Sequence, residues 1–274
     1  MRCSLWIAQR VPDGAVFVCA NQFRIRDILP GNPDQIFNPA LPEQLKSLGW
    51  DVRDETTGQL DWVRSLQAEE DFHPYFALRR VWRVMSLVAP SHNLPAKVEG
   101  YATRIYPFAI KPDQPLTLDA LIAIHRDAFE GTPFDMTTGD GAGLFASPYR
   151  YGKISCEQAI ASLITGYTWI TQANANLPAP VAWISLDTAR GRDSVITPDI
   201  RTAAKALEKQ GQDLIQANQA LSPAQFASLL RSNALHSEAA WKEFYGQLLV
   251  KYNQKHNSSY APDHAPAPEN HQSY

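Results

Sequence analysis

Short apolar runs and turn-forming segments alternate along the first 70 residues of the chain. Residues 15–20 are almost entirely apolar and predict a buried strand, which ends at the polar residue Asn21. Residues 29–40 are rich in Pro, Gly, Asn and Asp and predict a loop. The segments that follow predict two helices, one over 42–48 and one over 61–70.

The next apolar pattern has the spacing of an amphipathic helix over residues 76–88. Its apolar side chains recur every three or four positions, and Pro90 ends the pattern. Arg79, Arg80 and Arg83 occupy the remaining face. We therefore predict a helix with one apolar face and one face that carries arginines.

The central part of the chain predicts strands on either side of a well-marked helix. Residues 104–110 predict a short strand. Thr117 is a cap residue for a helix over 118–129, which has an aspartate in its first turn and a glycine just past its end. Residues 160–172 and 181–186 predict two further strands, because their aromatic and β-branched side chains suit a sheet core.

The last third of the chain has helical composition. Ala, Gln, Lys and Leu dominate residues 199–220 and predict a helix, and a Ser-Pro-Ala-Gln capping sequence then opens a second one over 222–252. The end of the chain is rich in Pro, Ser, Asn and His. We expect a sheet-containing domain over 1–198, helices over 199–256 and a disordered tail over 257–274.

Composition narrows the class of protein. The 274-residue chain is 45% apolar and holds seven tryptophans, which predicts a sizeable packed core. A net charge of −3 gives no electrostatic case for nucleic acid or an anionic membrane as partner, and no apolar run approaches the roughly 18 residues that span a bilayer. Cys3, Cys19 and Cys156 fit neither a disulfide framework nor a zinc pattern. We expect a cytoplasmic protein that uses no metal or other cofactor.

Most residues of chemically useful type have a plain structural interpretation. The glycine-rich segment 139–143 lacks the Lys-Ser/Thr of a phosphate loop and does not follow a strand, which favours turn glycines. None of the seven histidines has metal-ligand spacing, and His125 is interpreted as a partly exposed structural residue rather than a general base. Asp135 and Asp140 suit turn caps as readily as acid–base groups.

Three polar residues after the first predicted strand are the better candidates for chemistry. Asn21 stands where an amide N–H is able to point at an oxyanion from a fixed backbone, although an Asx-turn explains the same residue. Arg24 and Arg26 lie on the same side of an extended segment. One of them suits pairing with a substrate carboxylate, and the alternative is a solvated edge.

Several stretches, taken together, resemble one known family. They are Trp6–Gly14, Ala20–Ile25, Arg79–Val84 with Leu87–Ser91, Tyr106–Asp113, His125–Thr137, Ala142–Arg150 and Leu248–Asn253. In their order and spacing they resemble the N-terminal-nucleophile cysteine dipeptidases of the dipeptidase A type.

The resemblance implies an α+β fold, the four-layer αββα sandwich of the N-terminal-nucleophile hydrolases, and hydrolysis of dipeptides without metal. In that family a cysteine at the first position of the mature chain attacks the peptide carbonyl, and its own α-amino group is the base. Related bile-salt hydrolases and penicillin acylases place an oxyanion-hole asparagine after a comparable strand, which implies that role for Asn21. The substrate-binding candidates are Arg24, Arg26, Asp135 and Arg150.

The chain also departs from the family pattern. Family members begin far upstream of the segment that starts at Trp6, so we expect an incomplete αββα member that lacks the nucleophile-bearing portion. Cys3 does not replace that nucleophile, because removal of Met1 exposes Arg2. Ile164 stands where the family carries an arginine before Thr-x-Tyr, and a tryptophan-rich segment is missing after Asp199.

Three hypotheses on function follow. The first is a dipeptidase-family protein that is inactive by itself. The second is a non-catalytic binding or complementing subunit that needs a separate N-terminal piece. The expected partners are such a piece or further copies of the same chain in a homo-oligomer. The third is a distinct hydrolase that uses His125 or Asp135 as its base.

Overall fold

The computed structural model describes most of the chain as a mixture of helices and small sheets. The described residues are 6–66, 75–98, 100, 103–139, 142, 157–162, 165–186 and 197–257. The chain divides into two compact units, of which the first holds residues 1–170 and 184–192 and the second holds 171–183 and 193–274. The predicted α+β class is confirmed, and the predicted boundaries after residues 198 and 256 stay predictions.

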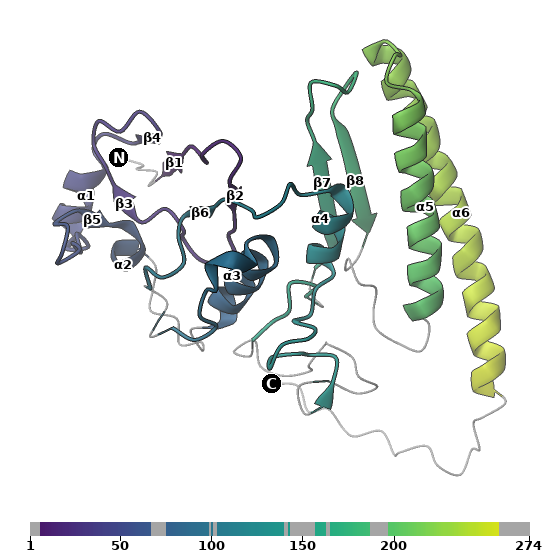
Figure 1. The fold of residues 1–274 in the computed structure, drawn as a ribbon, viewed down its shortest axis with the longest axis horizontal. Coiled ribbons are helices and arrows are strands. Elements are labelled where there is room, and N and C mark those ends of the chain that lie inside the picture. The colour runs from purple at the N-terminus through teal and green to yellow at the C-terminus, as the bar shows by residue number, and fades with distance from the viewer. Residues whose placement is uncertain are drawn as a thin grey trace. The chain divides into compact units, whose positions relative to one another are not determined.

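The sheets of the first unit are antiparallel ladders of two or three residues (Figure 1). The pairs are β1 (Ile7–Gln9) with β4 (Gln35–Phe37), β2 (Val16–Phe17) with β6 (Ala109–Ile110), and β3 (Asp27–Ile28) with β5 (Leu60–Asp61). The strands predicted over 15–20 and 104–110 are therefore real but much shorter than expected.

The loop predicted over residues 29–40 is wrong in part, because it contains β4. The Gln35 side chain closes the turn that brings this strand back. Its Nε2 donates to the carbonyl of Asp27 at 2.8 Å, and its Oε1 accepts from the backbone N–H of Leu29 at 2.8 Å. The buried side-chain amide of Gln35 is hydrogen-bonded at both its nitrogen and its oxygen. These bonds, rather than a longer strand ladder, hold the chain where it turns back.

The predicted helices of the first unit are present. They are α1 (Leu41–Leu48), α2 (Trp62–Leu66), α3 (Tyr75–Val88) and α4 (Leu118–His125), and a 3₁₀ turn over Pro90–His92 follows α3. Gly49 ends α1 in the left-handed conformation with φ of 70°.

Helix α4 begins as predicted but ends early. Thr117 caps it by accepting from the N–H of Ala120 at 3.1 Å. The helix stops at His125 instead of residue 129, where Phe129 adopts a left-handed φ of 67° that a helix does not contain. The last four residues of the helix predicted over 61–70 lie outside the described residues.

The apolar face of α3 carries the main core of the first unit. Leu78, Val81 and Met85 are fully buried, and they pack in one cluster with Ile110 of β6 and Val16 of β2. Burial of each such side chain stabilises the fold by about 1.5–3 kcal/mol. The packing thus explains why strands as short as β2 and β6 hold together.

The arginine-bearing face of α3 is also covered. Arg79 is 2% exposed and donates from Nε and Nη2 to the two carboxylate oxygens of Glu157, at 3.1 Å each. Its guanidinium lies 3.4 Å from the ring centroid of Phe134. Arg83 pairs with Asp127 through Nη2 and Oδ2 at 2.7 Å. These two arginines are internal connectors of the fold.

The two strands predicted over 160–172 and 181–186 form a pair, β7 (Tyr167–Gln172) and β8 (Val181–Leu186), and the first begins seven residues later than predicted. Their expected place in a sheet core is wrong for the aromatic residues of β7. Tyr167 is 66% exposed and Trp169 is 65% exposed, whereas Val181 is buried. Side chains two residues apart share one face of a strand, so this face of β7 is open in the described part of the chain.

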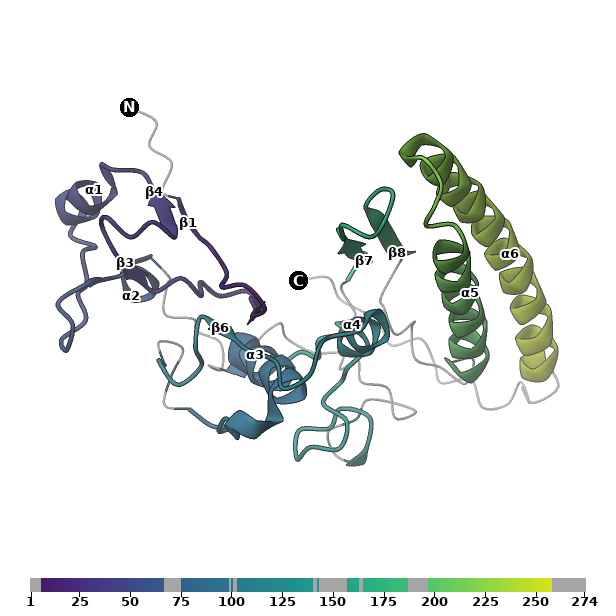
Figure 2. The ribbon, with the colours of Figure 1, turned by 45° about the horizontal axis from the view of Figure 1, so that its top comes forward.

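Most of the second unit is a helical hairpin of α5 (Thr197–Ala217) and α6 (Pro223–Asn257), which lie side by side in Figures 1 and 2. The predicted capping sequence is confirmed: the N–H of Ser222 donates to Gln225 Oε1 at 3.1 Å. Helix α6 runs five residues past its predicted end. The predicted disordered tail lies outside the described residues.

Candidate functional site

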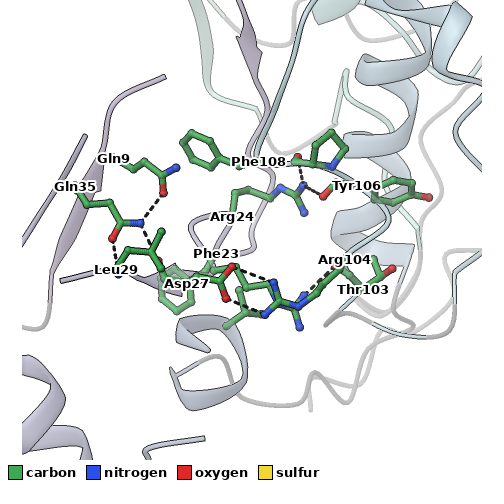
Figure 3. A pocket seen from close by; sticks show the side chains of 13 residues that line it. Gln9, Phe23, Arg24, Asp27, Leu29, Gln35, Thr103, Arg104, Tyr106 and Phe108 are labelled. Carbon is green, nitrogen blue, oxygen red and sulfur yellow. Dashed lines mark hydrogen bonds and ion pairs between the residues drawn. The ribbon is translucent and has the colours of Figure 1, made fainter. Parts of the chain in front are cut away.

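A polar cavity of about 170 Å³ opens in the first unit (Figure 3). Three arginines line it, namely Arg24, Arg26 and Arg104. The sequence predicted that Arg24 and Arg26 share one side of the chain, and their shared cavity is consistent with that expectation. The partners of the three guanidinium groups differ, and that difference decides what each of them is able to bind.

Arg26 is neutralised inside the protein. Its Nε and Nη2 donate to Oδ2 of Asp61 at 3.0 and 2.9 Å, and its Nη1 donates to the carbonyl of Thr103 at 2.9 Å. Asp61 is fully buried, and its other oxygen accepts from the N–H of Arg64 at the start of α2. The pair joins β3 to β5 and leaves little of Arg26 for a ligand.

Arg104 is also matched by carboxylates. It donates to both oxygens of Asp27, at 2.8 and 3.0 Å, and to Asp54 at 2.9 Å. The hydrogen bond with Asp27 is the largest of the effects that raise the pKa of Arg104. The pKa of Asp54 is lowered, first by the backbone N–H of Thr57. Arg104 therefore acts as a clamp between β3 and the loop before β5.

Arg24 has no such match in the described part of the chain. It is 9% exposed, and its Nη2 donates to the carbonyls of Tyr106 and Pro107 at 2.9 and 2.8 Å (Figure 3). Its Nε is buried and bonds to no described residue. Burial lowers the pKa of Arg24, which expresses the cost of holding a cation away from water. Such a group is complementary to an incoming anion.

Asn21 lies at the surface and does not line this cavity. It adopts a left-handed φ of 50°, and its Oδ1 accepts from Nη2 of Arg80 at 2.8 Å. Because a guanidinium only donates, the atom that faces Arg80 must be the carbonyl oxygen of the amide. The contact therefore fixes the orientation of Asn21 and turns its Nδ2 donors away from α3.

The remaining predicted residues are not brought to the cavity. Asp135 closes a turn: its Oδ1 accepts from the N–H and hydroxyl of Thr137, at 2.8 and 2.6 Å, and its Oδ2 accepts from the N–H of Gly131 at 3.1 Å. Arg150 and Cys3 lie outside the described residues. Cys19 is exposed, although it lies within the segment 15–20 that was predicted as a buried strand, and it donates to the carbonyl of Gln22 at 3.0 Å.

A second cavity, of about 220 Å³, adjoins β7. His125 lines it together with Thr165, Tyr167 and Trp169. Burial lowers the pKa of His125, which favours the neutral form of its imidazole. Tyr167 is the other titratable residue in this lining, and no carboxylate there orients the imidazole. The arrangement is consistent with a structural histidine.

Sequence reasoning missed Arg104, Asp27 and Asp61. A sequence signal was available for Asp61, a charged residue with the apolar neighbours Leu60 and Trp62, because a charge that is buried needs a counter-charge. Within the described ranges, no three His, Cys, Asp or Glu side chains are grouped as metal ligands, and no helix is long and apolar enough to cross a membrane.

Comparison with known proteins adds one match. The model of peptidase family C69 matches residues 2–214, which include every strand and helix of the first unit. No curated protein matches the chain.

Proposed function

The chain belongs to peptidase family C69, the dipeptidase A family, and on that premise we propose that it takes part in the hydrolysis of dipeptides. The match supports a hydrolase of the cysteine peptidase kind. It also supports, as a proposal, the αββα sandwich of N-terminal-nucleophile hydrolases as the parent architecture. The observation that carries the proposal is the family match over both the arginine cavity and Asn21.

The reaction needs a thiol whose neighbouring amine is free. All three cysteines of this sequence follow another residue, so their α-amino groups are in peptide bonds. The hydrogen bond of Cys19 to Gln22 holds its thiol on a carbonyl, which is not a base for nucleophilic attack. We therefore propose that the 274-residue chain by itself does not turn over dipeptides.

Asn21 is the proposed oxyanion donor of the reaction, and it stands outside the lining of the arginine cavity. Arg80 holds the carbonyl end of its amide, and the Nδ2 hydrogens are then the donors that remain for a developing negative charge. Removal of one oxyanion donor typically lowers kcat by about 10²–10³. This loss is measurable only in a preparation that contains the reacting thiol.

The test is a dipeptide panel with the purified chain. We expect no release of amino acids and no covalent acyl adduct by mass spectrometry. Turnover that disappears in Cys3→Ser, Cys19→Ser or Cys156→Ser would identify a nucleophile within this chain and contradict the proposal. Turnover that survives all three substitutions but not His125→Ala or Asp135→Asn would instead support a different hydrolytic mechanism.

A second candidate role, a binding subunit for a separate nucleophile-bearing chain, is favoured by the sheets of the first unit. Each described sheet has two strands. Apart from β5, whose second edge bridges to Arg53, each strand of the first unit's sheets keeps one edge that no other described strand pairs. Open edges are sites where another chain adds strands. Co-purification with such a chain would support this role, and a cooperatively folding monomer without partners would argue against it.

A further inference from the structure

We propose that Arg24 binds the free carboxylate of a short peptide in the arginine cavity, and that Arg26 and Arg104 do not. The choice of a peptide as the source of the carboxylate rests on the proposed function. The choice of Arg24 rests on charge, geometry and burial alone.

The charges around the cavity select Arg24. Arg26 is paired with Asp61, and Arg104 is paired with Asp27 and Asp54. Arg24 differs from the other two because its described partners are backbone carbonyls and include no carboxylate. A buried cation that lacks a carboxylate is unfavourable by itself, and an anionic ligand that enters the cavity supplies the missing charge.

The donors of Arg24 are suited to that ligand. A guanidinium has five N–H donors, and Nη2 uses its two on Tyr106 and Pro107. The carbonyl bonds hold the guanidinium plane in place, so a ligand does not have to order the side chain. Nη1, which makes no hydrogen bond to a described residue and is not buried as Nε is, then keeps two preoriented N–H donors for a carboxylate oxygen.

The walls of the cavity limit the size and kind of ligand. Its volume of about 170 Å³ lies below the range of about 300–1,000 Å³ that is typical for drug-sized ligands. Phe23, Phe108 and Leu29 contribute apolar wall to the same cavity (Figure 3). A carboxylate with one adjacent apolar side chain, which is the C-terminal residue of a short peptide, matches both features.

The test compares two ligands that differ in one charge. Isothermal titration calorimetry of the purified chain with Ala-Phe and with its C-terminal amide should show about 10- to 100-fold tighter binding of the free acid, since a hydrogen bond to a charged group contributes on that scale. Arg24→Met should remove this difference. Arg10→Met, which removes an exposed arginine outside the cavity, should leave it unchanged.

Three results would overturn the proposal: equal affinity for acid and amide, an unchanged preference in Arg24→Met, or Arg24-dependent binding of acetate without binding of Ala-Phe. If Arg24→Met does not fold, Arg24→Lys and the acid–amide comparison on the unaltered chain still decide. The calorimetric measurement detects binding of the peptide and does not require its hydrolysis. Dipeptide hydrolysis by the chain alone therefore contradicts the proposed inactivity and leaves the carboxylate site standing.

Discussion

Two buried arginines of the first unit, Arg79 on α3 and Arg24 beside β3, have opposite surroundings. Arg79 is fully bonded inside the protein, with the Glu157 carboxylate on one edge and aromatic rings against its plane. Arg24 contacts two backbone carbonyls and keeps a buried Nε without a bond to the described residues. The difference teaches that internal pairing, rather than burial, separates an arginine that holds the fold from one suited to a ligand.

Arg83, one helical turn after Arg79 on α3, is also bonded inside the protein. Arg83 binds both oxygens of Asp127 and also the carbonyl of Glu130. Asp127 in turn accepts from the N–H of Phe129, which supports the left-handed conformation of that residue. Two stretches that carry the family resemblance, one on α3 and one after α4, are thereby joined by a single ion pair.

The largest expected effect tests the structural half of this comparison. Arg79→Met should lower the free energy of unfolding by about 3–5 kcal/mol, because it leaves the Glu157 carboxylate without its buried partner. Urea unfolding followed by tryptophan fluorescence measures the change.

The matched control for Arg79→Met is Arg10→Met, which removes an arginine that is 63% exposed and should change stability by less than about 1 kcal/mol. A loss from Arg79→Met no larger than that of the control would mean that the pair with Glu157 does not hold the fold.

Tyr106 provides a second test of the comparison, because both Arg79 and Arg24 lower the pKa of its phenol. Burial raises the pKa of Tyr106 to about 12, and Arg79 opposes this rise more strongly than Arg24 does. The folded state thus keeps the phenol protonated while the unfolded state ionises from about pH 10. Its contribution to stability is complete below pH 10 and should fall by about 2–3 kcal/mol as the pH rises to 12.

The measurement is the difference in unfolding free energy between the unaltered chain and Tyr106→Phe from pH 8 to 12. The difference should shrink over the upper half of this range, and a constant difference would contradict a raised pKa. Spectroscopic titration of the phenol in the arginine variants should show a higher pKa after loss of Arg79 than after loss of Arg24.

Local sequence rules found the helices but not the ladders. Helical spacing placed α3 within one residue at its start, and cap residues located the starts of α4 and α6. The capping contacts lie within four residues, so the sequence contains them. The ends of β2 depend instead on β6, about 90 positions later, because a strand is as long as its partner permits.

The arginine cavity was predictable only in outline. Alternation along an extended segment placed Arg24 and Arg26 on one side. It did not reveal that Arg26 forms an ion pair with Asp61, because the two residues are 35 positions apart in the sequence. Periodicity also places polar side chains opposite the apolar face without showing whether another segment covers them, as Glu157 covers Arg79 from 78 positions away.

The smallest expected effect tests the ligand half of the comparison. Arg24→Met should change the unfolding free energy by no more than about 1 kcal/mol, far less than Arg79→Met. The lost carbonyl bonds are offset because a buried charge without a counter-ion is replaced by an apolar side chain of similar length. Parallel urea titrations of both variants measure the contrast. If Arg24→Met destabilises as much as Arg79→Met, then Arg24 is a structural arginine as well, and its carbonyl contacts, rather than an awaited anion, explain its burial.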